Sequence, residues 1–172
     1  MEQPIYIHYG DDHYDPAKMK RAKNQPYPWN KPDGDTGLWA SRVDATYGWK
    51  DWCENENFRE CIDEHSFLFS LKPDANVVMV HCLKDLFEIP EADTSNYYSE
   101  REHIFDFIDD YRIDFEECLN EGIDAIELGW YGDEWADVKD DDMYMALYGW
   151  DCDCILVLNP DVIIPIEKEK TE

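Results

Sequence analysis

The chain has 172 residues, of which 44% are hydrophobic, and its 41 acidic residues far outnumber its 15 basic ones. That length predicts one domain with a sizeable core, and that composition excludes a wholly disordered chain. The formal net charge of −26 excludes binding of DNA or RNA through a basic groove, because the surface would repel phosphate backbones. Three interpretations of the acidic composition remain open: a solvated surface, a cation-binding protein, or a protein that imitates nucleic acid.

No apolar run approaches the ~20 residues that a membrane helix needs, and the N-terminal residues lack the pattern of a signal peptide. Six scattered cysteines, in a chain with enough apolar residues for a core, are typical of reduced and buried thiols. We therefore expect a cytoplasmic protein with no membrane partner, compatible with a bacterial or phage origin.

Apolar runs rich in β-branched and aromatic residues predict six strands. In chain order they cover residues 4–9, 37–41, 66–71, 76–82, 123–128 and 154–158. The connection over residues 11–37 is rich in proline and lysine, and loops of that length are uncommon unless they are functional.

Four segments predict helices. Asp44 is expected to cap a helix over residues 46–55, and one helical turn is expected at residues 83–89. The clearest helix covers residues 99–122, where apolar side chains recur at spacings of three and four. These side chains are Ile104, Ile108, Tyr111, Phe115, Cys118 and Leu119. A short helix is expected near residues 141–149.

The predicted strands and helices do not alternate strictly, which indicates an α+β fold. The sequence shows no internal repeat, no P-loop and no Gly-x-Gly-x-x-Gly motif. We expect a single domain over residues 1–166, followed by a charged tail at residues 167–172.

His8 ends the first predicted strand. A histidine there can be structural, or it can hydrogen-bond a ribose or an amide with either ring nitrogen. His8, Asp11, Asp12 and His13 also lie close together in the sequence, but their spacing matches no standard metal site. We expect no metal.

Trp39 and Ser41 share the second predicted strand, where an indole face can stack on a planar heterocycle beside a hydroxyl group. The alternative is that Trp39, Trp49 and Trp52 pack the core. Trp49 and Trp52 are three residues apart on a predicted helix, which favours the core for at least one of them.

Three carboxylates near strand ends are candidates for acid–base chemistry. Glu127 ends an apolar strand, which suits either a general base of raised pKa or a buried hydrogen bond. Asp151 and Asp153 lie at the start of the last strand.

Three blocks of sequence occur in an order that resembles the ADP-ribosyltransferase-like family, whose members bind NAD and transfer its ADP-ribose. They are IYIHYG, then TGLWASRVDATYGWKDWC, then the strands in FLFSLKPDANVVMVH, GIDAIEL and CILVLNPDVIIPI; together they cover about half of the chain. The resemblance implies two small, mostly antiparallel sheets that form a central cleft flanked by helices.

In that family the histidine of the first strand grips the adenosine ribose, and the next residue contacts nicotinamide through its backbone. The resemblance therefore implies that His8 and Tyr9 bind NAD. It also implies that two aromatic side chains enclose nicotinamide: Trp39, together with Trp49 or Tyr47.

The diphosphate of NAD calls for positive charge, and the few basic residues are concentrated in one part of the chain. They are Lys18, Lys20, Arg21, Lys23 and Lys31, with Arg42 after Ser41. We therefore expect residues 15–42 to flank the cleft and to supply positive charge against an acidic body.

The family's catalytic glutamate stands immediately before the last apolar run, and that place falls on Cys154 here. A cysteine cannot stabilise the positive charge that develops on the ribose as NAD is cleaved. Either Asp151, Asp153 or Glu127 supplies the carboxylate, or the protein binds NAD without catalysis.

The resemblance predicts an NAD-dependent mono-ADP-ribosyltransferase-like protein, with NAD as its substrate and an acceptor that the sequence does not specify. The acidic composition supports another class, a non-enzymatic interaction protein that imitates nucleic acid or inhibits a basic partner. The first function needs His8, Trp39 and the aspartates of the last strand in one cleft. The second needs rows of acidic side chains on one face.

Overall fold

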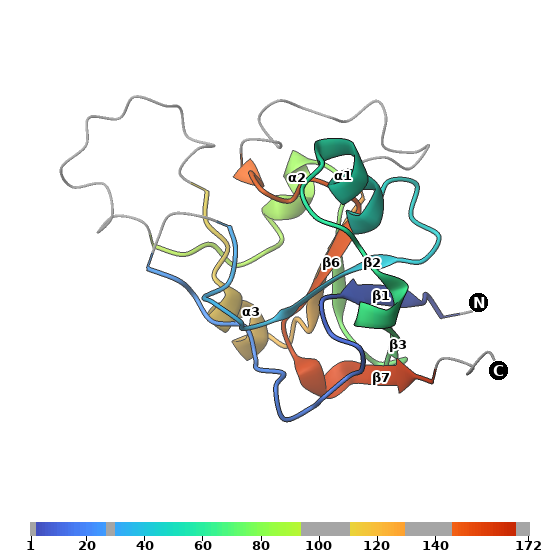
Figure 1. The fold of residues 1–172 in the computed structure, drawn as a ribbon. Helices are drawn as coiled ribbons and strands as arrows, with labels where there is room; N and C mark the ends of the chain where they lie inside the picture. Colours follow the sequence, from blue (N-terminus) through green and yellow to red (C-terminus); the bar gives the residue numbers. More distant parts are fainter. Residues whose placement is uncertain (1–2, 27–29, 94–110, 130–145, 168–172) are drawn as a thin grey trace.

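The computed structural model describes residues 3–26, 30–93, 111–129 and 146–167 (Figure 1). Within these ranges the fold is α+β, as the sequence predicts. The strands are β1 (Tyr6–Tyr9), β2 (Leu38–Arg42), β3 (Ser66–Leu71), β4 (Val77–Val80), β5 (Ala125–Leu128), β6 (Cys154–Val157) and β7 (Ile163–Ile166). The helices are α1 (Trp49–Glu56), α2 (Leu83–Leu86) and α3 (Phe115–Asn120), with the 3₁₀ turns η1 (Asp63–His65) and η2 (Pro160–Val162). No helix in these ranges is long and apolar enough to cross a membrane.

The expectation of two separate sheets is corrected by the pairing of β2. The seven strands form one sheet in the order β4-β5-β6-β2-β1-β3-β7, in which only β4 and β5 run parallel. The first three residues of β2 pair with β6, and Ser41 and Arg42 pair with β1. A single strand thus joins the two halves that the resemblance implied as separate sheets.

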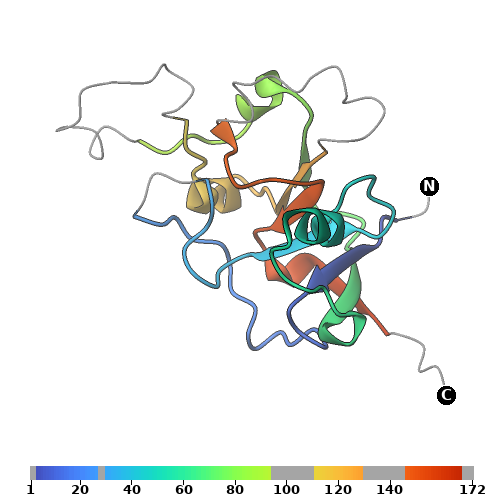
Figure 2. The same cartoon turned by 45° about the horizontal axis from the view of Figure 1, so that its top comes forward.

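The sheet is strongly curled, as its connections require. β3 and β4 are five strand spacings apart, which would be about 24 Å in a flat sheet. The six residue steps from Leu71 to Val77 reach at most about 21 Å when fully extended, and residues 72–75 form a turn that shortens this reach. The two halves must therefore fold toward each other, and β1 and β7 run across the direction of β6 (Figures 1 and 2).

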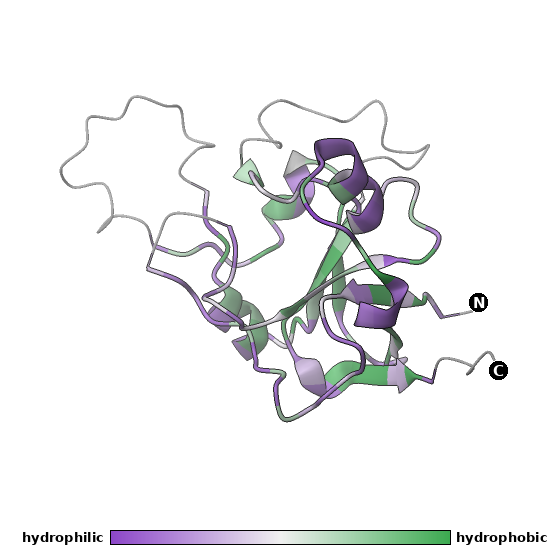
Figure 3. Cartoon of the chain, viewed as in Figure 1, coloured by the Kyte–Doolittle hydropathy of each residue, from purple (hydrophilic) through white to green (hydrophobic). Residues whose placement is uncertain are grey.

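Two hydrophobic clusters lie on the two faces of this curled sheet. Between the halves, Phe69 and Leu71 of β3 pack with Ile155 and Val157 of β6 in one cluster. The opposite face of β5 and β6 packs against α2, α3 and the segment around Trp150 in the other. Figure 3 shows mostly hydrophobic residues along β6 and β7 and mostly hydrophilic residues along α1.

Helix α1 begins later than the sequence predicts, with Gly48 rather than Asp44 as its N-cap. The Ser41 hydroxyl accepts a hydrogen bond from Trp49 N at 2.9 Å, and Asp51 accepts one from Gly48 N at 2.8 Å. A Cβ atom at position 48 would lie 3.1 Å from Ser41 Cβ. The glycine therefore allows close approach of α1 to β2.

The long helix predicted over residues 99–122 is confirmed only in part. Residues 94–110 lie outside the described ranges, and α3 covers only Phe115–Asn120, with Asp114 accepting a hydrogen bond from Glu117 N at 2.9 Å. Tyr111 and Ile113 lie before the helix, and Ile113 forms a β-bridge with Glu91. The short helix predicted near residues 141–149 and the charged tail also fall largely outside the described ranges.

Candidate functional site

A cavity of about 830 Å³ opens where β1 and β2 stop pairing. The ladder between the two strands pairs Tyr6 with Arg42 and Ile7 with Ser41; toward the other end β2 pairs with β6 and β1 stays with β3. Residues of both separated ends line the cavity: Ile7, His8, Tyr9, Leu38, Trp39 and Ala40. The volume lies within the range of pockets that enclose small-molecule ligands.

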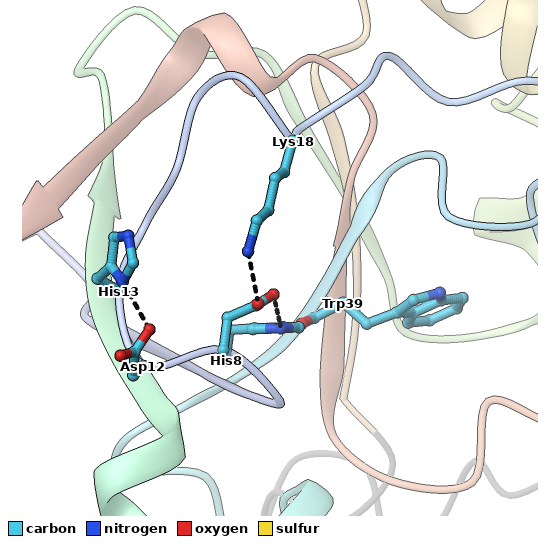
Figure 4. A network of polar contacts seen from close by, with 6 residues as sticks. His8, Asp12, His13, Lys18 and Trp39 are labelled. Carbon is cyan, nitrogen blue, oxygen red and sulfur yellow. Dashed lines mark hydrogen bonds and ion pairs between the residues drawn. The ribbon is translucent and has the colours of Figure 1, made fainter.

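The His8 ring spans the gap between the two strands (Figure 4). Its Nδ1 lies 2.6 Å from the carbonyl oxygen of Trp39, and a carbonyl can only accept, so Nδ1 carries the proton. Burial lowers the pKa of His8, which keeps the ring neutral at pH 7. Nε2 is then a hydrogen-bond acceptor on the cavity wall, 3.8 Å from Asp11, whose other oxygen lies 3.6 Å from Lys18 Nζ.

Two half-buried indoles line the cavity, and each is held by a second one. Trp39 packs edge-on against the buried Trp150, with ring centroids 4.7 Å apart. Trp49 stacks on Trp52 at 5.0 Å, and the Arg59 guanidinium lies 5.2 Å from the Trp49 ring centroid. The aromatic walls are therefore fixed in orientation, which suits a planar ligand.

Positive charge gathers around the cavity despite the acidic composition of the chain. Lys18, Lys20 and Lys31 from the long loop line it, and Arg59 joins them from the turn after α1, while Asp11, Asp35 and Asp151 also line it. Lys20 pairs with Asp35 at 2.7 Å. An anionic ligand would thus meet basic side chains here, although such side chains are few in the chain as a whole.

The structure places Ser41 and Arg42 away from the cavity. Ser41 is only 2% exposed, and its hydroxyl donates to the carbonyl of Asp153 at 2.8 Å while accepting from Trp49 N. It therefore ties β2, α1 and the start of β6 together. Arg42 forms a two-pronged ion pair with Glu127 on the other side of the sheet.

Among the three candidate carboxylates, Asp151 lines the cavity. Glu127 is 5% exposed and accepts hydrogen bonds from Arg42 Nη2 at 2.9 Å and from the Tyr6 hydroxyl at 3.1 Å. Of its two predicted roles, this geometry is that of a buried, paired carboxylate. Asp153 accepts from Tyr47 N at 3.2 Å and does not line the cavity.

Cys154, at the place of the family's glutamate, is a buried thiol beside Cys152. The hydrogen bond with Cys152 and burial raise the pKa of Cys154 well above that of a free thiol, so it carries no charge at pH 7. Both thiols line the cavity. Burial also raises the pKa of Asp151, and nearby Lys31 acts against that rise. The ionisation of Asp151 in the cavity thus depends on burial and on Lys31.

Sequence reasoning missed Arg59 and Trp150 as cavity residues. A signal for Trp150 was present, because the triplet Tyr-Gly-Trp occurs both at residues 47–49 and at residues 148–150. The tryptophans of both copies line the cavity. Arg59 carries no comparable signal, since its place depends on the turn that brings it back over Trp49.

Comparison of the chain with protein-family models, with curated proteins and with solved structures found no match. Within the described ranges, no group of three or more His, Cys, Asp or Glu side chains could hold a metal ion.

Proposed function

We propose that the protein binds NAD in the cavity between β1 and β2 and transfers its ADP-ribose to an acceptor. The observation that supports this most is that His8, Trp39 and Asp151, from three separate segments of the sequence, all line one cavity. The resemblance implies that His8 binds a ribose, that Trp39 stacks on nicotinamide, and that Asp151 stabilises the charge that develops on the ribose.

The chemistry requires each of these groups. Cleavage breaks the bond between ribose C1′ and the nicotinamide nitrogen, which keeps the electron pair, and positive charge develops on the ribose. A carboxylate beside that ribose stabilises the charge, a role for Asp151. The indole face of Trp39 holds the nicotinamide ring, Trp49 lines the cavity with its ring against Trp52 and Arg59, and His8 Nε2 accepts a hydrogen bond from a ribose hydroxyl. Lys18, Lys20 and Arg59 are the cations for the diphosphate.

A second candidate function is supported by the net charge of −26, which suits an acidic protein that occupies a basic partner. It makes no use of the cavity and predicts no response to NAD.

Titration with NAD, followed by tryptophan fluorescence, separates these two functions. We expect saturable quenching, because Trp39 and Trp49 line the cavity, and slow release of nicotinamide in a parallel assay. An unchanged emission spectrum at millimolar NAD would leave the interaction protein as the better account.

His8→Ala is expected to weaken NAD binding about 5- to 150-fold, because a buried hydrogen-bond partner worth about 1–3 kcal/mol is lost. His13→Ala is the matched control, since His13 is exposed, pairs with Asp12 and does not line the cavity. Thermal melts of both variants report any loss of folding. Equal affinity in the two variants would return His8 to a structural role.

Asp151→Asn is expected to lower nicotinamide release about 10²- to 10³-fold while NAD still binds, the scale of losing one transition-state charge contact. Asp153→Asn is the comparison, because it changes the other aspartate of the same strand start without touching the cavity. If Asp153→Asn lost the activity and Asp151→Asn kept it, the assignment of the carboxylate would be reversed.

A further inference from the structure

Lys31 lies directly across Gly149, on the same cavity wall as Asp151. A Cβ atom at position 149 would be 2.6 Å from Lys31 Cε and 2.8 Å from Lys31 Nζ. Gly149 also has a φ of +90°, which side-chain-bearing residues rarely adopt. The glycine thus provides the space in which the lysine side chain lies, and all three residues line the cavity.

The backbone that carries Lys31 is held firmly in this place. The preceding residue, Asn30, is 3% exposed; its amide donates to the carbonyl of Ala146, and its own carbonyl accepts from the Trp150 indole at 2.6 Å. On the other side, Gln25 donates to the Lys31 carbonyl at 2.8 Å. Lys31 and the turn that leads into Asp151 are therefore fastened to each other through buried hydrogen bonds.

We propose that Lys31, laid across Gly149, is a positioning residue that keeps the Asp151 carboxylate ionised on the cavity wall for the transfer step; this rests on the function proposed above. The charged side chains that act on Asp151 within the described ranges are Lys31 and, with the opposite effect, Glu56 at the end of α1. Burial and Glu56 both favour the protonated acid, so the lysine is the group that opposes them.

A carboxylate that stabilises developing positive charge must be ionised at the working pH. Removal of the lysine charge leaves burial and Glu56 unopposed, which moves the titration of Asp151 to higher pH. The acid limb of the pH–activity profile moves in the same direction. A merely structural lysine would lower stability or binding without moving either midpoint.

The experiment is an NMR titration of the Asp151 carboxyl carbon in the full, NAD-free chain at low ionic strength. The variants are Lys31→Met, Lys31→Arg, Gly149→Ala and, as the matched control, Lys23→Met. Lys23 is an exposed lysine of the same loop that does not line the cavity. We expect an upward shift of the midpoint in Lys31→Met and Gly149→Ala, and a midpoint near the wild-type value in Lys31→Arg and Lys23→Met.

A midpoint that is the same in Lys31→Met and in Lys23→Met would overturn the proposal. The readout is independent of NAD, so failure of the proposed function would appear separately, as absent NAD binding in a protein whose Asp151 midpoint still responds to Lys31. Where NAD is turned over, the acid limb of the activity profile should move upward in Lys31→Met and stay in place in Lys31→Arg. An unmoved limb in Lys31→Met would contradict the role in transfer.

Discussion

Replacing Arg42 by alanine is expected to lower the free energy of unfolding by about 3 kcal/mol, the low end for breaking a buried ion pair, since Arg42 is itself partly exposed. In the variant the Glu127 carboxylate stays almost fully buried. Of the two side chains that donate hydrogen bonds to it, Arg42 and Tyr6, only the Tyr6 hydroxyl remains. For a chain of this length the melting temperature should fall by about 6–12 °C. Chemical denaturation and calorimetry measure both quantities.

A triple variant, Tyr6→Phe/Arg42→Met/Glu127→Leu, is the control for this prediction. It removes the two charges and the hydroxyl together, so no buried polar group loses its partner, and such replacements are often neutral or stabilising. We expect it to recover most of the stability lost in Arg42→Ala. A single Arg42→Ala variant as stable as wild type would show that the ion pair contributes nothing.

Asn30→Ala is expected to destabilise the fold by about 3 kcal/mol, because three buried backbone groups lose their side-chain partner at once. The Asn30 amide donates to the carbonyls of Tyr111 and Ala146, and its oxygen accepts from Ile113 N at 2.8 Å. This one side chain therefore fastens the long loop to two distant segments. Denaturant unfolding measures the loss.

Asn120→Ala is the matched control for Asn30, because Asn120 is exposed and its amide bonds only to Glu117 of the same helix among the described contacts. Its effect should stay within about 0.5 kcal/mol. Equal stability of the two variants would mean that the hydrogen bonds of Asn30 do not hold the loop in solution.

Six of the seven strands could be predicted because their signal is local, whereas β7 (Ile163–Ile166) was not predicted. In β3 and β6, runs of apolar and β-forming residues mark the elements within one or two positions of the observed bounds. The curl of the sheet could not be predicted in this way, since it follows from β2 pairing with two different strands at different points along its length. That arrangement depends on residues more than 100 positions apart.

The helix over residues 99–122 shows how a distant contact overrides a local pattern. Tyr111 fits the helical spacing, but its carbonyl group and the amide of Ile113 both bond to the side chain of Asn30. Ile113 also bridges to Glu91, and the helix begins only after Asp114. No sequence feature near Tyr111 and Ile113 indicates that their backbone groups will hydrogen-bond to the Asn30 side chain.

The candidate site could be predicted in part for the same reason. His8, Tyr9, Trp39, Trp49 and Asp151 were recognisable by residue type and place, and the structure brings them to one cavity. The sequence could not show that the other predicted site residues lie outside the cavity, because their hydrogen-bond and ion-pair partners come from distant parts of the chain. Ser41 bonds to the backbone of residue 153, and Arg42 pairs with a carboxylate 85 positions away.

Mapping of NAD binding by amide and indole NMR shifts tests the central claim most directly, because it reports both whether and where the ligand binds. We predict saturable shifts that gather on His8, Trp39, Trp49 and their neighbours around the cavity, and that are absent from the far face of the sheet around β7. A spectrum that does not change at millimolar NAD, or shifts that spread over the acidic surface and leave these residues unmoved, would contradict the assignment of the cavity as a dinucleotide site.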